Sequence, residues 1–318
     1  MSRAFTTIGL LLLGILVVAS AIGYALHLRS EGRSDTVANL NARIRAWWGM
    51  AVVMFGAMLL GSTVTLVVFA FASAMALREF LTLTPTRQAD YWPLFIAFFV
   101  AIPLQYVLLG MQWYGLFSVF IPVYVFGLIS FASALSQDTD DFFQRNAMIL
   151  FAVMVCVYGV SHAPGILILD IAGFEGRNVE LLFFFLFIVQ LSDVLQYVFG
   201  KLFGRHKLSP KVSPSKTWEG LIGGGLSATL VGGALHTITP FGFWVAAALA
   251  LQIVACGALG GLVLSAVKRS LGAKDWGSSI AGHGGFMDRL DSVTFSAPVF
   301  FHVVRYFWTS DGLMGGPR

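Results

Sequence analysis

The sequence predicts an all-α, polytopic membrane protein with about nine or ten transmembrane helices. Of its 318 residues, 57% are hydrophobic and only 11% are charged, whereas a soluble domain carries about 25% charged residues. The apolar residues fall in runs of roughly 18 or more, which is the length that a helix needs to cross the hydrocarbon core. Because lipid offers no partners to backbone amides and carbonyls, the spanning elements should be helices.

The hydrophobic runs define the expected spans. They lie at about 5–26, 47–77, 92–110, 113–135, 146–169, 179–200, 218–238, 241–266 and 291–308. The first run is long for a signal peptide and has only a weak cleavage pattern, so we expect it to be a retained span. The second run is too long for one span, and we predict a hairpin of two short helices that turns near Gly61 and Ser62.

The distribution of basic residues predicts the orientation. With the hairpin, all but four of the 20 Lys and Arg residues lie in loops on one side; Arg3, Arg177, Arg305 and Arg318 lie on the other. The positive-inside rule then predicts ten spans, both termini outside and basic loops in the cytoplasm of a bacterial inner membrane. We expect one membrane-embedded domain over residues 1–318, with N-terminal transmembrane helices in 1–180 and catalytic helices and loops in 181–318. The net charge of +4 does not suggest nucleic acid as a partner.

Polar residues inside apolar runs are costly, and Asp193 is one of them. It lies in the run 179–200, seven residues before Gly200. A carboxylate at that depth faces protein, water or a cation. It therefore either binds a metal or substrate, or makes a structural hydrogen bond between helices.

The segment from Lys201 to Gly225 is basic and ends in an apolar helix. Ser213, Lys216 and Thr217 stand just before that helix, where free backbone amides and the positive end of the helix dipole favour a phosphate. The alternative is that the basic residues only orient the protein or attract anionic lipid.

A second polar segment runs from Ser265 to Asp291 and is unusually rich in both charges and glycine. It contains Lys268, Arg269, Lys274, Asp275, His283, Asp288, Arg289 and Asp291. Asp288 and Asp291 share a face if a helix begins there. Carboxylates that hold Mg²⁺, with cations that neutralise phosphates, would explain this composition. The alternative is a solvated loop with surface ion pairs.

These segments resemble the signature of the phosphatidate cytidylyltransferases, which make CDP-diacylglycerol from CTP and phosphatidate. The matching elements are Ser265, Lys268, Arg269, Lys274, Asp275, His283, Gly284, Gly285, Asp288, Arg289 and Asp291, with Ser213-Pro214-x-Lys216-Thr217-Trp218-Glu219-Gly220 upstream. Two positions depart from the family pattern: Ala281 replaces a proline and Gln196 replaces an alanine. They indicate a divergent branch.

The resemblance implies the roles of the site residues. Asp275, Asp288 and Asp291, with Asp193 as a fourth carboxylate, would hold Mg²⁺; Lys268, Arg269, Lys274 and Arg289 would bind the phosphates of the two substrates. His283 would contact a phosphate or fix the glycine-rich turn, and Ser213, Lys216 and Thr217 would close the site. The resemblance also suggests that the protein forms a homodimer. Membrane lipids are a further expected partner. Three alternatives stay open: a CTP-dependent polyprenol or phytol kinase, a transporter with Asp193 in its pathway, and a catalytically dead paralogue that acts as an assembly partner.

Overall fold

The computed structural model describes residues 3–29, 34–280 and 284–309, which fold almost wholly into helices. In this part of the chain, nine helical segments are long and apolar enough to cross a membrane. They are Phe5–Arg29, Leu40–Leu60, Ser62–Leu83, Gln88–Gly110, Tyr114–Leu135, Phe142–Ile168, Asn178–Phe203, Gly220–Ile238 and Phe243–Ser270. The prediction of a polytopic all-α membrane protein is therefore confirmed.

Several of these segments are built from more than one element. The α-helices are α1 (Arg3–Arg29), α2 (Asp35–Leu60), α3 (Ser62–Leu83), α4 (Tyr91–Ile96), α5 (Ile102–Gly110), α6 (Tyr114–Val119), α7 (Phe126–Leu135), α8 (Phe142–Val153), α9 (Val160–Gly165), α10 (Asn178–Phe203), α11 (Gly225–Ala234), α12 (Phe243–Ser270) and α13 (Met287–Trp308). Wider π-helical turns are η2 (Ala97–Ala101), η3 (Phe120–Val125), η4 (Met154–Gly159) and η6 (Gly220–Gly224). Tighter turns are η1 (Gln88–Asp90), η5 (Ile166–Ile168) and η7 (Leu235–Ile238).

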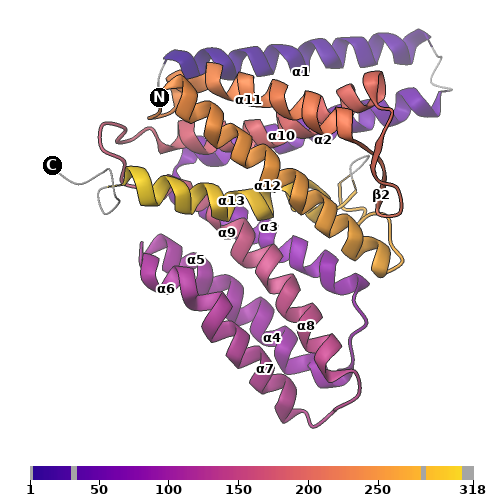
Figure 1. Ribbon diagram of the computed structural model, residues 1–318, viewed down its shortest axis with the longest axis vertical. Helices are drawn as coiled ribbons and strands as arrows, with labels where there is room; N and C mark the ends of the chain where they lie inside the picture. The colour runs from indigo at the N-terminus through magenta and orange to yellow at the C-terminus, as the bar shows by residue number, and fades with distance from the viewer. Residues whose placement is uncertain (1–2, 30–33, 281–283, 310–318) are drawn as a thin grey trace.

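The last helix, α13, is a tenth helix of the bundle, although its first turns carry Asp288, Arg289 and Asp291. It packs along α12. Figure 1 shows the start of α1 and the end of α13 on one side of the bundle and the strand β2 on the other.

The long apolar run 47–77 is interrupted at Gly61, which separates α2 from α3. Gly61 has a φ angle of +108°, a region that an L side chain adopts only with strain. The two helices pack against each other and count as separate spans. The predicted hairpin at Gly61 and Ser62 is therefore confirmed.

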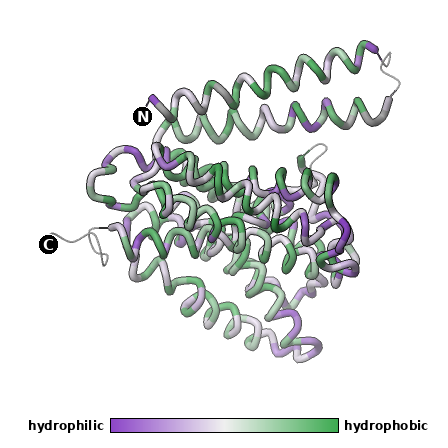
Figure 2. Tube along the Cα trace, turned by 45° about the horizontal axis from the view of Figure 1, so that its top comes forward, coloured by the Kyte–Doolittle hydropathy of each residue, from purple (hydrophilic) through white to green (hydrophobic). Residues whose placement is uncertain are grey.

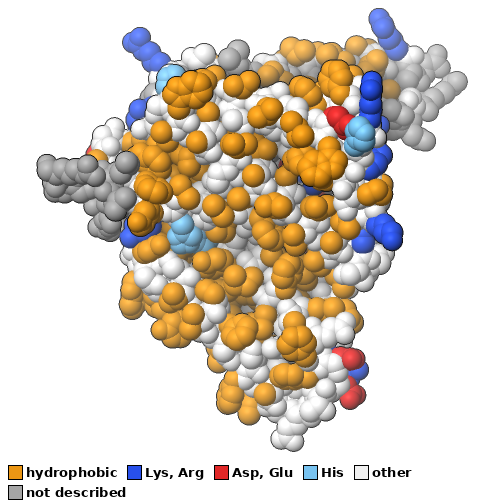
Figure 3. Space-filling model, viewed as in Figure 1, with side chains coloured by type: hydrophobic (Ala, Val, Ile, Leu, Met, Phe, Trp, Pro, Cys, Tyr) orange, Lys and Arg blue, Asp and Glu red, His pale blue; other side chains and the backbone are white. Residues whose placement is uncertain are grey.

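The core of the bundle lies between α10 and its neighbours. Phe184 and Phe185 of α10 are fully buried and pack against Phe300 of α13, with ring centroids 6.4 and 5.3 Å apart. Figure 2 shows the α1–α2 hairpin along one edge, with apolar residues over most of both helices. In Figure 3 hydrophobic side chains cover the middle of the visible face, and most of its Lys and Arg side chains lie on the side of β2.

An ion-pair network joins the loops before α4 and before α8. The buried Arg145 lies 2.9 Å from Asp138 and 3.6 Å from Asp90. The more exposed Arg87 lies 3.6 Å from Asp138 and 3.2 Å from Asp140. Both loops are thereby held at one end of the N-terminal helices.

Candidate active site

The predicted phosphate-binding segment folds as a β-hairpin and not only as a helix start. The strand β1 (Lys207–Ser209) pairs antiparallel with β2 (Ser213–Thr217), so Lys207 faces Thr217 and Ser209 faces Ser213. The helix begins directly after β2, and the Thr217 hydroxyl accepts a hydrogen bond of 3.1 Å from the Gly220 amide. The predicted helix start is therefore confirmed. The hydroxyl of Thr217, which was expected to close the phosphate site, caps this helix in the structure.

Glu219 anchors the base of this hairpin. Its carboxylate accepts from the amide of Arg205 at 3.1 Å and from Nδ1 of His206 at 2.6 Å. Hydrogen bonds from its own amide and from His206 lower the pKa of Glu219 to about 2. In the turn between β1 and β2, the carbonyl of Val212 accepts a hydrogen bond of 3.3 Å from Nε of Arg269. The hairpin is thus tied both to η6 and to the end of α12.

Two carboxylates from different helices meet beside the hairpin, and we call Asp193 and Asp291 the carboxylate pair. The hydroxyl of Ser292 donates to both carboxylate oxygens of Asp193, at 3.3 and 3.1 Å. The amide of Ser292 donates to Asp291 at 2.8 Å. Asp193 is an exposed residue and Asp291 a half-buried one, so the pair lies close to the surface of the bundle.

Lys216 of β2 reaches toward the carboxylate pair across Gly261 of α12. A β-carbon at Gly261 would lie 2.8 Å from Nζ of Lys216 and 3.9 Å from Oδ2 of Asp291. The absence of a side chain there lets the ammonium group approach. The charges of Lys216 and Arg289 act on both carboxylates, so sequence-distant parts of the predicted site do come together.

Asp288 is held by three donors. Its Oδ1 accepts from Nζ of Lys268 at 2.7 Å, and its Oδ2 accepts from the amides of Trp276 at 2.9 Å and Gly285 at 3.0 Å. The side chains of Lys268 and Asp288 are only 11% and 6% exposed. This arrangement fixes Trp276 and Gly285, on either side of the part of the loop before α13 that is not described, to α12 and to the start of α13.

The remaining predicted residues lie around this centre. Lys274 and Asp275 are exposed, and Arg269 donates to the carbonyl of Ala273 at 3.1 Å. Ser213 is buried at 8% exposure. Nε of Arg289 is buried without a hydrogen-bond partner among the described residues. His283 and Ala281 lie outside the described residues.

Three further residues shape the site, and sequence reasoning did not assign them. Ser292 orients the carboxylate pair, Gly261 leaves room for Lys216, and the buried Glu79 of α3 contacts the loop before α13. The hydroxyl next to Asp291 was a signal for Ser292. Gln196, in contrast, donates to Ser192 at 2.6 Å, so the departure from the family pattern is accommodated within α10.

The carboxylate pair fits a magnesium ion better than the full predicted set does. Mg²⁺ commonly binds one or two protein carboxylates and fills its other positions with waters and substrate phosphates. Asp193 and Asp291 supply such a pair. Among the described residues no three His, Cys, Asp or Glu side chains gather, and Asp288 has the three donors given above. The assignment of Asp275 and Asp288 to the metal stays a prediction.

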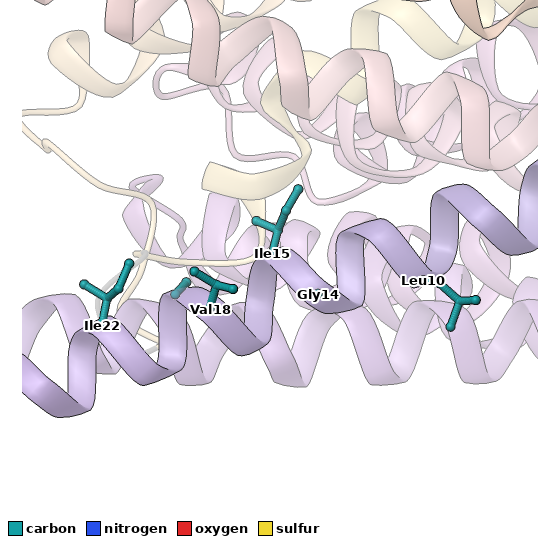
Figure 4. Close-up of a pocket in the computed structure, with 6 residues that line it drawn as sticks. Leu10, Gly14, Ile15, Val18 and Ile22 are labelled. Carbon is teal, nitrogen blue, oxygen red and sulfur yellow. The ribbon is translucent and has the colours of Figure 1, made fainter.

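Two apolar surface depressions of the bundle lie away from these polar residues. One of about 550 Å³ lies on α1 and is lined by Leu10, Gly14, Ile15, Val18, Ala19 and Ile22 (Figure 4). Another of about 250 Å³ lies between η3 and α8 and is also apolar. Both are surfaces that lipid tails would cover.

Comparison with known proteins identifies the family. The model of the cytidylyltransferase family matches residues 41–307, a range that contains the carboxylate pair, the β-hairpin and the loop before α13. The chain belongs to the cytidylyltransferase family. It is therefore a nucleotidyltransferase, and the family predicted from the signature residues is confirmed.

The individual relatives share different amounts of this chain. YnbB of Escherichia coli (strain K12), an uncharacterized protein, is 37% identical over 301 residues, which are 93% of this chain and 96% of YnbB. The phosphatidate cytidylyltransferase of Mycobacterium leprae (strain TN) is 48% identical over 117 residues, 35% of this chain and 36% of that enzyme. The phosphatidate cytidylyltransferase of Aquifex aeolicus (strain VF5) is 31% identical over 180 residues, 56% of this chain and 63% of that enzyme. The chain thus spans less than two thirds of each named enzyme.

Proposed function

We propose that this member of the family is a Mg²⁺-dependent CTP:phosphatidate cytidylyltransferase, which releases pyrophosphate and supplies CDP-diacylglycerol for phospholipid synthesis. The observation that carries the proposal is the cluster of Asp193, Asp291 and Lys216, an accessible carboxylate pair beside a cation at one end of a helical bundle. The names of the relatives that share this region support the lipid substrate.

The reaction joins two phosphates. A phosphate oxygen of phosphatidate attacks the α-phosphorus of CTP, the bond to the β-phosphate oxygen breaks, and that oxygen leaves with the electron pair as pyrophosphate. Such transfers depend on positioning and on neutralising charge in the transition state. The attacking phosphate is largely deprotonated near neutral pH, since its second pKa is about 6, so no protein base is needed.

The residues divide this work by their charge. Asp193 and Asp291 would hold Mg²⁺, which would supply positive charge to neutralise the substrate phosphates. Lys216 and Arg289 would bind phosphate oxygens beside the pair. Lys268 would join them if it were released from Asp288, and Arg269 and Lys274 lie on the exposed rim where the nucleotide would enter.

We further propose that the hairpin side of the bundle faces the cytoplasm of a bacterial inner membrane, where CTP is available. The basic residues of the connecting loops lie mostly on this side, which agrees with the positive-inside rule. The variant Lys211→Cys places a cysteine in the hairpin. This cysteine should react with an impermeant maleimide only in inverted vesicles. Reaction in right-side-out vesicles would reverse the orientation.

The reaction is tested with purified protein in detergent, Mg²⁺, phosphatidate and CTP labelled at the α-phosphate. Label should pass into the lipid fraction with release of an equal amount of pyrophosphate. Label that remains in CDP would identify a CTP-dependent lipid kinase. CTP that is not consumed with phosphatidate would contradict the proposed substrate.

A further inference from the structure

A buried carboxylate from the N-terminal half of the chain lies against the described parts of the loop before α13, residues 271–280 and 284–286. Glu79, near the end of α3, is only 6% exposed. Its Oε1 accepts from the hydroxyl of Ser279 at 2.7 Å, and its Oε2 accepts from the amide of Met287 at 3.0 Å. Within the described residues no cation forms an ion pair with Glu79, so these donors compensate for its burial.

The loop is shaped around this side chain. A β-carbon at Gly277 would lie 2.9 Å from Cδ of Glu79, and one at Gly285 would overlap with Oε2. The neighbouring Phe80 stacks on Trp276 of the loop, with ring centroids 4.6 Å apart and an angle of 20°. Two successive residues of α3 therefore grip the loop, one through hydrogen bonds and one through an aromatic face.

The contact with Met287 has a consequence for the site, because Met287 is the first residue of α13. The first amides of a helix have no partners within the helix, and a carboxylate near them is stabilised by the helix dipole. Glu79 accepts from one of these amides. It thus fixes where α13 begins, and with it the positions of Asp288 and Asp291 in the first two turns of this helix.

We infer that Glu79 is a positioning residue for nucleotidyl transfer: it holds residues 276–280 and 284–286 and the start of α13 so that Asp291 lies beside Asp193. The inference rests on the proposed function for its kinetic consequence, whereas the hold on the loop can be measured without any substrate. Glu79 does not touch the reacting groups in this role. Its loss should therefore act through the loop and α13.

The test compares Glu79→Gln, Ser279→Ala and a matched control, Asp90→Asn. Gln keeps the size of Glu79 and removes its charge. Ser279→Ala removes one hydrogen-bond donor to Glu79 and leaves Glu79 in place. It replaces Glu79→Gln as the test variant if Glu79→Gln folds poorly. Asp90 is also a buried carboxylate of the N-terminal half, at 2% exposure, but it pairs with Arg145 instead of the loop. Each variant is first checked for cooperative thermal unfolding in detergent.

Two readouts are combined: hydrogen exchange of residues 276–280 and 284–290 in substrate-free protein, and kcat and KM for CTP. Glu79→Gln should speed exchange in both segments and lower kcat/KM for CTP at least about tenfold, since small misplacements of reacting groups cost up to about 10²-fold. Ser279→Ala should change both in the same direction by less. Asp90→Asn should leave exchange in these segments and kcat/KM unchanged.

A double-variant cycle separates positioning from a general loss of stability. Gly285→Ala should lower kcat/KM in the wild-type background because its β-carbon displaces Glu79. In a Glu79→Ala background, where that space is free, it should add no further loss. Full additivity, or normal kcat/KM in Glu79→Gln, would overturn the inference. If the wild type transfers no cytidylyl group while Glu79→Gln still speeds exchange, the proposed function fails and the hold on α13 stands.

Discussion

Breaking the buried ion pair between Lys268 and Asp288 should strongly destabilise the substrate-free protein. Nζ of Lys268 lies 2.7 Å from Oδ1 of Asp288, and the two side chains are 11% and 6% exposed. Solvent therefore screens the pair little. Asp288→Asn keeps the shape of the side chain and leaves the ammonium group of Lys268 buried without its counter-ion. Removing one partner of a buried pair costs about 3–5 kcal/mol.

The assay is reversible unfolding in mixed micelles with increasing SDS, without Mg²⁺ or nucleotide. The matched control is Asp140→Asn, which breaks an exposed pair with Arg87 whose side chains are 78% and 44% exposed; exposed pairs contribute at most about 1 kcal/mol. The double variant Lys268→Met/Asp288→Asn should recover part of the stability lost in Asp288→Asn. The reasoning is refuted if Asp288→Asn and Asp140→Asn lower the free energy of unfolding equally.

Three other substitutions test separate parts of the site. Gly261→Ala places a methyl group 2.8 Å from Nζ of Lys216 and should reduce kcat/KM for CTP up to about 10²-fold by moving the cation, which steady-state rates will show; an unchanged kcat/KM contradicts this. Ser292→Ala frees the carboxylate of Asp193 and should raise the Mg²⁺ concentration for half-maximal activity about 10-fold or more; a Mg²⁺ titration that matches wild type contradicts it. Glu219 has its pKa lowered to about 2, so its stabilisation of the hairpin is present above its ordinary value of 4.5 and is lost as the pH falls toward 2. Trypsin cleavage within 205–211 at pH 8 should therefore be faster in Glu219→Gln, and equal rates would contradict the anchoring role.

The spans could be predicted because hydrophobicity and length are properties of each segment by itself, and nine of the ten expected spans recur among the described residues as helices long and apolar enough to cross a membrane. The break at Gly61 could be predicted too, since loop charges required an extra crossing there. The hairpin of β1 and β2 was missed because Ser213–Thr217 shows no alternation of apolar and polar residues. Its strands are held by Glu219 and Arg269, which are contacts that no local pattern announces.

The sequence predicted which residues belong to the site, but it did not predict which of their side chains contact one another. The signature residues gave the right segments, and the relatives confirm the family. The spacing predicted that Asp288 and Asp291 share a helix, and both lie in the first two turns of α13. It did not predict that Asp288 pairs with Lys268 while Asp291 lies by Asp193. Glu79 was invisible because its partner Met287 lies 208 positions away. A lone carboxylate at the end of an apolar helix was the only signal for it.

The most direct test of the central claim is transfer of the α-phosphate label of CTP into lipid by wild type and by Asp291→Asn. Glu175→Gln serves as the control, because Glu175 is an exposed carboxylate before the start of α10, at the other end of that helix from the hairpin. Wild type and Glu175→Gln should transfer equal amounts of label from CTP into the lipid fraction, and a folded Asp291→Asn should transfer none. Normal labelling by Asp291→Asn, or none by wild type, would contradict the account.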